Sequence, residues 1–145
     1  MAGEKSTTYS GQLLALLFNA TTIPNIAINA TSSPLTTLYC SLATADPTAS
    51  GTQSTNEVTY TSYARVAVAR TTGGWTVSGA SVSPVSNIIW PTPTGAAGQV
   101  ATYVVIGTAA SGAGTMLYAA ALSPTITITV GLPPTCTPAS VITEA

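Results

Sequence analysis

From Leu35 onward, short runs rich in β-branched and aromatic residues alternate with turns that contain glycine or proline. The clearest run, residues 125–130, alternates threonine with an aliphatic residue, so we expect Ile126, Ile128 and Val130 to share one face of a strand. Other runs lie at residues 36–42, 63–68, 75–83, 88–90, 103–107 and 116–122, and an edge strand is expected at 141–142. Many short strands with such spacing are typical of an antiparallel β-sandwich of the jelly-roll kind. The predicted fold class is therefore all-β.

The first twenty residues carry the helical pattern of the chain. Apolar side chains recur at the spacing of one helix face, at Tyr9, Leu13, Leu16 and Leu17, and Leu14 and Phe18 widen this stripe. Residues 6–8 and Ser10 offer hydroxyl groups for the N-cap. Pro24 ends any continuation of this helix. We expect an N-terminal helix or arm over residues 1–34 and a single β-sandwich over 35–145. The helix either packs on the core of its own chain or docks on a partner.

The chain is short of charge. Its 145 residues include three Lys or Arg and four Asp or Glu, so charged residues make up 5%, where an average domain has about 25%. Three cations are too few for a basic patch, which excludes nucleic acid and an anionic membrane surface as expected partners. No stretch approaches the roughly 20 apolar residues of a membrane span. Since free proteins normally keep charge on their surface, we expect hydroxyl groups, other copies or another protein to cover part of this one.

The ionisable groups do not predict a catalytic site. There is no histidine, so the Ser-His-Asp and Cys-His arrangements and the commonest metal ligand are excluded. Asp46 and Glu57 flank one loop and are the best available carboxylate pair for a small hydrolase. However, Asp46 precedes Pro47, where aspartate typically organises a turn, and Glu57 is expected to pair with Arg65 or Arg70. We predict that the protein is not an enzyme, with no cofactor and no metal.

A glycine-rich segment, residues 107–114, resembles a phosphate-binding loop only superficially. The P-loop pattern needs lysine where Ala113 stands, and the dinucleotide-binding pattern needs glycine where Leu117 stands. The segment is predicted to be a hairpin loop whose glycines permit positive φ angles.

The two cysteines, Cys40 and Cys136, leave two alternatives open. A disulfide between them would close a loop of about 95 residues and stabilise the fold by about 4–5 kcal/mol. The alternative, which we favour, is two reduced thiols that behave as small hydrophobic residues.

The aromatic residues are scattered along the sequence. Most are expected to pack in the core or on a sheet face. Trp90, which precedes Pro91, is the best candidate for an exposed aromatic residue. An exposed aromatic platform would indicate a carbohydrate-binding module.

Four segments of the chain recur together in a known family. They are residues 41–47, 56–68, 106–114 and 117–118, within a region that spans about 35–130. Together they resemble a family of small virion proteins of tailed bacteriophages, often labelled tail-fibre proteins, some of which decorate or cement the capsid. The resemblance implies a structural role and carries over no catalytic residue.

The leading hypothesis is a capsid decoration or cement protein that stabilises the head shell of a phage. It would sit on the capsid surface of the virion after assembly in the host cytoplasm, and bind the major capsid protein and other copies of itself as a homodimer or homotrimer. Alternatives are a tail or tail-fibre component and a carbohydrate-binding β-sandwich module. The residues expected at an interface are Tyr9, Leu13, Leu17, Phe18 and Trp90.

Overall fold

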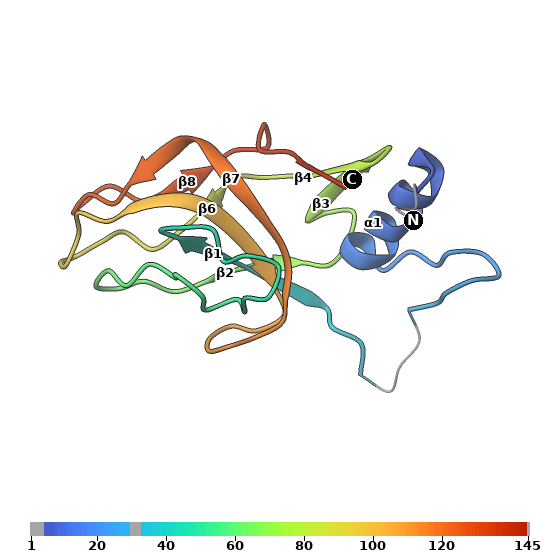
Figure 1. Cartoon of the computed structure of the whole chain (residues 1–145), viewed down its shortest axis with the longest axis horizontal. Helices are drawn as coiled ribbons and strands as arrows, with labels where there is room; N and C mark the ends of the chain where they lie inside the picture. Colours follow the sequence, from blue (N-terminus) through green and yellow to red (C-terminus); the bar gives the residue numbers. More distant parts are fainter. Residues whose placement is uncertain (1–4, 30–32, 145) are drawn as a thin grey trace. The chain divides into compact units, whose positions relative to one another are not determined.

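The computed structural model describes residues 5–29 and 33–144, and within them the protein is mostly β-structure with antiparallel strand pairs (Figure 1). The predicted all-β class with a short N-terminal helix is confirmed, and the arrangement is consistent with a β-sandwich. The elements are α1 (Thr7–Asn19), β1 (Thr37–Ala43), β2 (Val66–Ala69), β3 (Trp75–Ser78), β4 (Ser81–Pro84), β5 (Ile88–Ile89), β6 (Val100–Gly107), β7 (Met116–Thr127), β8 (Thr135–Cys136) and β9 (Ile142–Thr143).

The chain forms two compact units, each assembled from separate stretches of sequence. Unit 1 comprises Met1–Thr36, Ala69–Asn87 and Thr137–Ala145. Unit 2 comprises Thr37–Val68 and Ile88–Cys136. The proposed division of the chain at residue 34 stays a prediction.

Helix α1 of unit 1 begins where the sequence predicted. The Ser6 Oγ accepts a hydrogen bond from the Tyr9 backbone N–H at 3.2 Å, which satisfies one of the unpaired donors of the first turn. Its fully buried side chains are Ser10, Leu14 and Phe18, one every four residues. The Phe18 ring packs edge-on against Trp75 with the ring centroids 4.9 Å apart. The helix therefore buries the face centred on Leu14 and Phe18.

The small sheet of unit 1 has the strand order β3-β4-β9. β3 and β4 form a hairpin around Gly79, whose φ of +57° explains the bend expected in the run 75–83. β9 pairs with β4 and lies at one end of the sheet, as predicted for residues 141–142.

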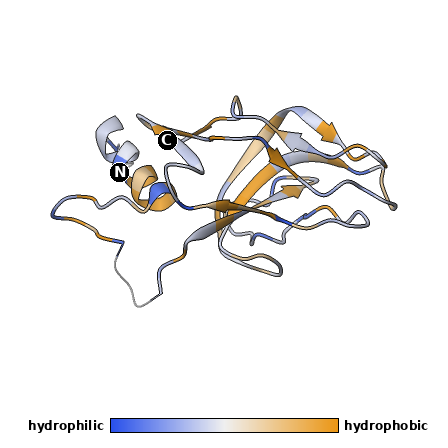
Figure 2. Cartoon of the chain, turned by 180° about the vertical axis from the view of Figure 1, so that it is seen from behind, coloured by the Kyte–Doolittle hydropathy of each residue, from blue (hydrophilic) through white to orange (hydrophobic). Residues whose placement is uncertain are grey.

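Unit 2 contains a four-stranded sheet of order β2-β1-β6-β7 and a two-stranded sheet of β5 and β8. β1 pairs with β6 from Tyr39↔Gly107 to Ala43↔Tyr103, and both strands are largely buried. Figure 2 shows hydrophobic residues along the strands of this unit. The packing of these strands forms a core that includes Leu42, Ala101 and Val105.

Two sequence expectations differ from the structure in unit 2. The runs 116–122 and 125–130 were expected to be separate strands, but β7 is continuous from Met116 to Thr127. The expected shared face also ends early. Ile128 is buried, whereas Val130 is 58% exposed because the chain turns at Gly131, where Thr129 bridges to Leu132. The alternation of threonine with aliphatic residues over 125–130 therefore continues past the end of β7 at Thr127.

Candidate functional site

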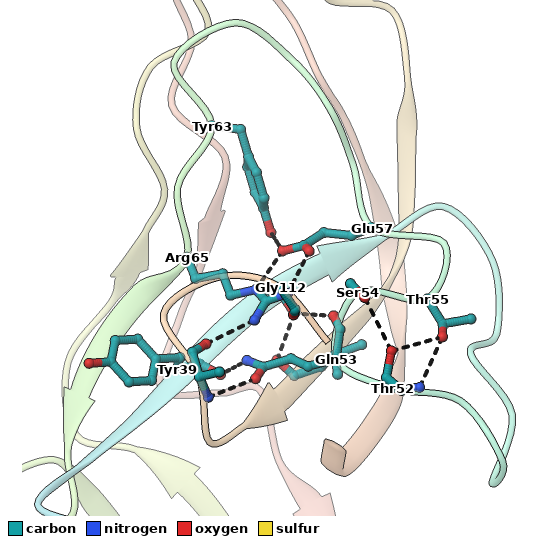
Figure 3. Close-up of polar contacts among 12 residues, drawn as sticks. Tyr39, Thr52, Gln53, Ser54, Thr55, Glu57, Tyr63, Arg65 and Gly112 are labelled. Atoms are coloured by element: carbon teal, nitrogen blue, oxygen red, sulfur yellow. Dashed lines mark hydrogen bonds and ion pairs between the residues drawn. The ribbon is translucent and has the colours of Figure 1, made fainter. Parts of the chain in front are cut away.

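A largely buried ion pair joins Glu57 and Arg65 in unit 2 (Figure 3). Both residues belong to the long connection between β1 and β2. The Arg65 guanidinium donates from Nε to the Glu57 Oε1 and from Nη2 to Oε2, each at 2.7 Å. The side chain of Arg65 is 2% exposed and that of Glu57 is 15% exposed. This bidentate geometry is the strongest form of the Arg–carboxylate pair. The predicted pairing of Glu57 with an arginine is confirmed.

The same guanidinium also holds the glycine-rich hairpin loop between β6 and β7. Its Nη1 donates to the Ala109 carbonyl at 2.9 Å and its Nη2 to the Gly112 carbonyl at 2.7 Å. The pKa of Arg65 is raised, above all by its hydrogen bond to Glu57. The cation therefore stays charged and joins two loops that are far apart in sequence.

Tyr63 adds a third member to this ion pair. Its phenol donates to the Glu57 Oε1 at 2.9 Å and accepts a hydrogen bond from the Leu42 backbone N–H at 3.0 Å. Burial raises the pKa of Tyr63 well above its ordinary value. The hydroxyl thus remains protonated and orients the carboxylate toward Arg65.

The Gln53 side chain fixes the other side of the hairpin loop. Gln53 is 1% exposed, and its Nε2 donates to the Tyr39 carbonyl at 2.8 Å while its Oε1 accepts from the Ala109 N–H at 3.1 Å. Its own backbone N–H donates to the Gly114 carbonyl at 2.9 Å. A Cβ on Gly114 would overlap the Ala109 Cβ and lie 2.9 Å from the Gln53 Oε1, so the loop has no room for a side chain at this position.

The remaining predictions about loops are confirmed. The Asp46 Oδ1 accepts from the Thr48 backbone N–H at 2.8 Å, which is the side-chain turn expected beside Pro47. Residues 108–115 connect β6 to β7 as a hairpin, and Gly112 has a φ of +72°. Asp46 therefore organises its own loop.

The structure separates the predicted interface residues into two groups. Tyr9 is 36% exposed, and Leu13 and Leu17 are partly exposed. Phe18 and Trp90 are buried and present no surface to a partner. The expectation of an exposed Trp90 is wrong, because its Nε1 donates to the Cys40 carbonyl at 3.1 Å and its ring fills the core of unit 2.

The two cysteines are buried in unit 2 with no disulfide between them. Burial, and to a lesser degree the charge of Cys136, raises the pKa of Cys40 to about 12. A thiol with such a pKa is protonated and inert at neutral pH, as expected for a core residue.

Arg70, in unit 1, holds the end of α1 through contacts that the sequence did not predict. It donates to the Leu16 carbonyl at 2.6 Å and the Leu17 carbonyl at 2.5 Å at the end of α1, and to the Asn29 Oδ1 at 2.7 Å. Burial lowers its pKa.

The described residues show no cluster of three or more side chains suited to a metal ion. The same part of the chain holds no helix long and apolar enough to cross a membrane.

None of the curated proteins matches this sequence. A family model, that of the podophage GP4 fiber I protein gp80, matches residues 5–143. That match covers both units and nearly the whole chain. The structural role in a phage virion that the resemblance implied is therefore shown, and the chain belongs to the family of the podophage GP4 fiber I protein gp80.

Proposed function

We propose that this protein is a fibre component of a podophage virion and works by binding alone. The description of its family as a fiber I protein supports the tail-fibre alternative over capsid decoration. The single observation that supports a non-catalytic role is that the ionisable side chains form hydrogen bonds within the fold. Glu57, Arg65 and Arg70 all bond to other parts of the chain, and Asp46 organises a turn.

The proposal gives the polar network a mechanical role. The Glu57–Arg65 pair and Gln53 tie two loops of unit 2 together, the β1–β2 connection and the β6–β7 hairpin, through charged and amide hydrogen bonds. A satisfied buried network of this kind rigidifies the loops that it joins. A virion part that transmits force or displays a binding surface needs such rigidity.

The experiment that tests the location is a cryo-EM map of the virion at side-chain resolution. Density for this chain in a fibre would support the proposal. Density on the head shell, between major capsid subunits, would overturn it in favour of the decoration hypothesis. Absence of the chain from the particle would overturn both.

Capsid decoration is the second candidate. It is favoured by the structure of the described residues, whose one helix, α1, has 13 residues and forms no long coiled-coil shaft. In that role the partners would be the major capsid protein and other copies of this chain on the capsid surface.

The contact surface proposed for either location is the exposed side of α1, with Tyr9, Leu13 and Leu17. Aspartate at both Leu13 and Leu17 is expected to reduce incorporation of the chain into virions, because it places charge on a nearly neutral surface. The matched control is aspartate at Gln12, a polar position on the same helix. Normal incorporation of the double variant would contradict this surface.

The other two alternatives have less support. The carbohydrate-binding hypothesis depended on Trp90, which is buried. The hydrolase hypothesis needed a free carboxylate at Glu57, which is bonded to Arg65 and Tyr63.

A further inference from the structure

The sequence offers few positions to a protease of the trypsin class. Such an enzyme cleaves after lysine or arginine, because an aspartate in its specificity pocket binds the cationic side chain. The chain has three such residues, Lys5, Arg65 and Arg70. Since the pocket takes up the whole side chain, a guanidinium group must leave its partners in the substrate before the enzyme can cut the chain.

The site at Arg65 is closed in unit 2 by four hydrogen bonds (Figure 3). The guanidinium donates twice to the Glu57 carboxylate and once each to the Ala109 and Gly112 carbonyls. The side chain of Arg65 is 2% exposed, and all of its partners belong to unit 2. Arg65 can therefore enter a protease pocket only after the ion pair has broken and the hairpin loop of residues 108–115 has moved away from it.

The site at Arg70 is closed in unit 1 by the same number of hydrogen bonds. The guanidinium donates to the Leu16 and Leu17 carbonyls at the end of α1. It also donates to the Asn29 Oδ1 and to the Leu35 carbonyl, and these partners all lie in unit 1. The two arginines thus have separate sets of partners, although only the four residues of β2 lie between them.

We infer that Arg65 and Arg70 are cryptic protease sites, each locked by four hydrogen bonds within its own unit, so that the folded chain resists trypsin-class proteases at both arginines. Lys5 differs, because its side chain is 35% exposed and forms an ion pair with Glu144. Cleavage after Lys5 leaves both locks in place. When a segment opens and closes faster than it is cut, the cleavage rate follows the population of the open form. Each arginine therefore reports the opening of its own unit, wherever the chain lies in the virion.

Limited proteolysis of the purified full chain with trypsin, followed by intact-mass spectrometry, tests the resistance. The folded chain is expected to remain whole from residue 6 onward under conditions in which the urea-unfolded chain is cut at both arginines. Ala97→Arg is the positive control, because it places a guanidinium on an exposed loop, where the folded chain is expected to be cut. Cleavage of the folded chain after Arg65 or Arg70 as fast as after position 97 would overturn the inference.

Two variants test whether each lock protects its own site, with the rates taken from the first fragments to appear. Glu57→Gln removes the counter-charge of Arg65 and is expected to speed cleavage after Arg65 at least about tenfold relative to cleavage after Arg70. Asn29→Ala removes one acceptor of Arg70 and is expected to speed cleavage after Arg70 about fivefold relative to cleavage after Arg65.

Circular dichroism establishes that each variant is folded before digestion. Because the two substitutions lie in different units, a variant that does not fold leaves the other to decide the question. A folded variant that speeds both cleavages equally, or neither, would overturn the inference, since the two sites would then open together in one global event.

Discussion

Removal of the Glu57 charge is expected to destabilise unit 2 strongly. Glu57→Gln keeps the size of the side chain but replaces one carboxylate oxygen with an NH₂ group. That group would face the Arg65 Nη2, which now donates to the Glu57 Oε2 at 2.7 Å. Two donors would meet, and a guanidinium with a side chain only 2% exposed would lose its counter-charge.

The structure sets the size of this effect. Breaking a buried ion pair by removal of one partner costs about 3–5 kcal/mol. The lower value applies here, because Arg65 keeps its bonds to the Ala109 and Gly112 carbonyls and the Glu57 side chain is 15% exposed. A loss of about 3 kcal/mol lowers the melting temperature of a chain of this length by about 10 °C.

Urea unfolding followed by circular dichroism measures the change in free energy. Asp46→Asn is the matched control, since it removes the same charge from the same loop and keeps the oxygen that caps the turn. It is expected to cost less than about 0.5 kcal/mol. Equal destabilisation by Glu57→Gln and Asp46→Asn would refute the reasoning that burial makes the Glu57–Arg65 pair important.

Three further outcomes are expected. Gly114→Ala should cost about 2 kcal/mol in urea unfolding, because the new Cβ would overlap the Ala109 Cβ and lie 2.9 Å from the Gln53 Oε1. Gly11→Ala should destabilise the protein by about 1 kcal/mol although alanine favours helices, because its Cβ would lie 2.5 Å from the Gly79 carbonyl oxygen. Stability should fall as the pH rises from about 9 to about 12, because unfolded Cys40 loses its proton near 9 while the folded thiol holds it to about 12. Denaturant titrations across that range, with Cys40→Ala for comparison, should show a shallower decline in the variant.

Gly73→Ala is the control for both glycine variants. A Cβ there would meet only the Thr71 Oγ1, at 3.6 Å, so the substitution should be close to neutral. Glycine variants that are all equally stable would contradict the close approaches described above. A stability that is flat above pH 9 would contradict the alkaline prediction.

The agreement between the sequence predictions and the structure depends on whether a feature is set by neighbouring residues or by residues far apart in the chain. The capping of α1 by Ser6, the Asp46 turn and the hairpin of residues 108–115 were all predicted correctly. Each depends on residues within a few positions of one another, so the sequence pattern contains the whole cause. Because the sequence contains only two arginines, the predicted partner of Glu57 was either Arg65 or Arg70.

The helix shows where local pattern was insufficient. The sequence placed Tyr9, Leu13 and Leu17 in one apolar stripe that Leu14 and Phe18 widen, and the spacing does not say which part of the stripe is buried. The structure buries Leu14 and Phe18, because Trp75 of β3 packs against Phe18. Trp90 was the best candidate for an exposed aromatic residue because Pro91 follows it, but it is buried and donates to the Cys40 carbonyl, 50 positions away.

The sequence by itself determined the fold class and the turns, because these follow from residue type and short-range spacing. Only the tertiary structure decided that Gln53 and Arg65 meet at the hairpin loop, that Tyr63 joins the Glu57–Arg65 pair, and that β7 lies at one end of its sheet. Those features depend on which distant segments come together when the core forms. The spacing of residues along the chain does not predict such contacts.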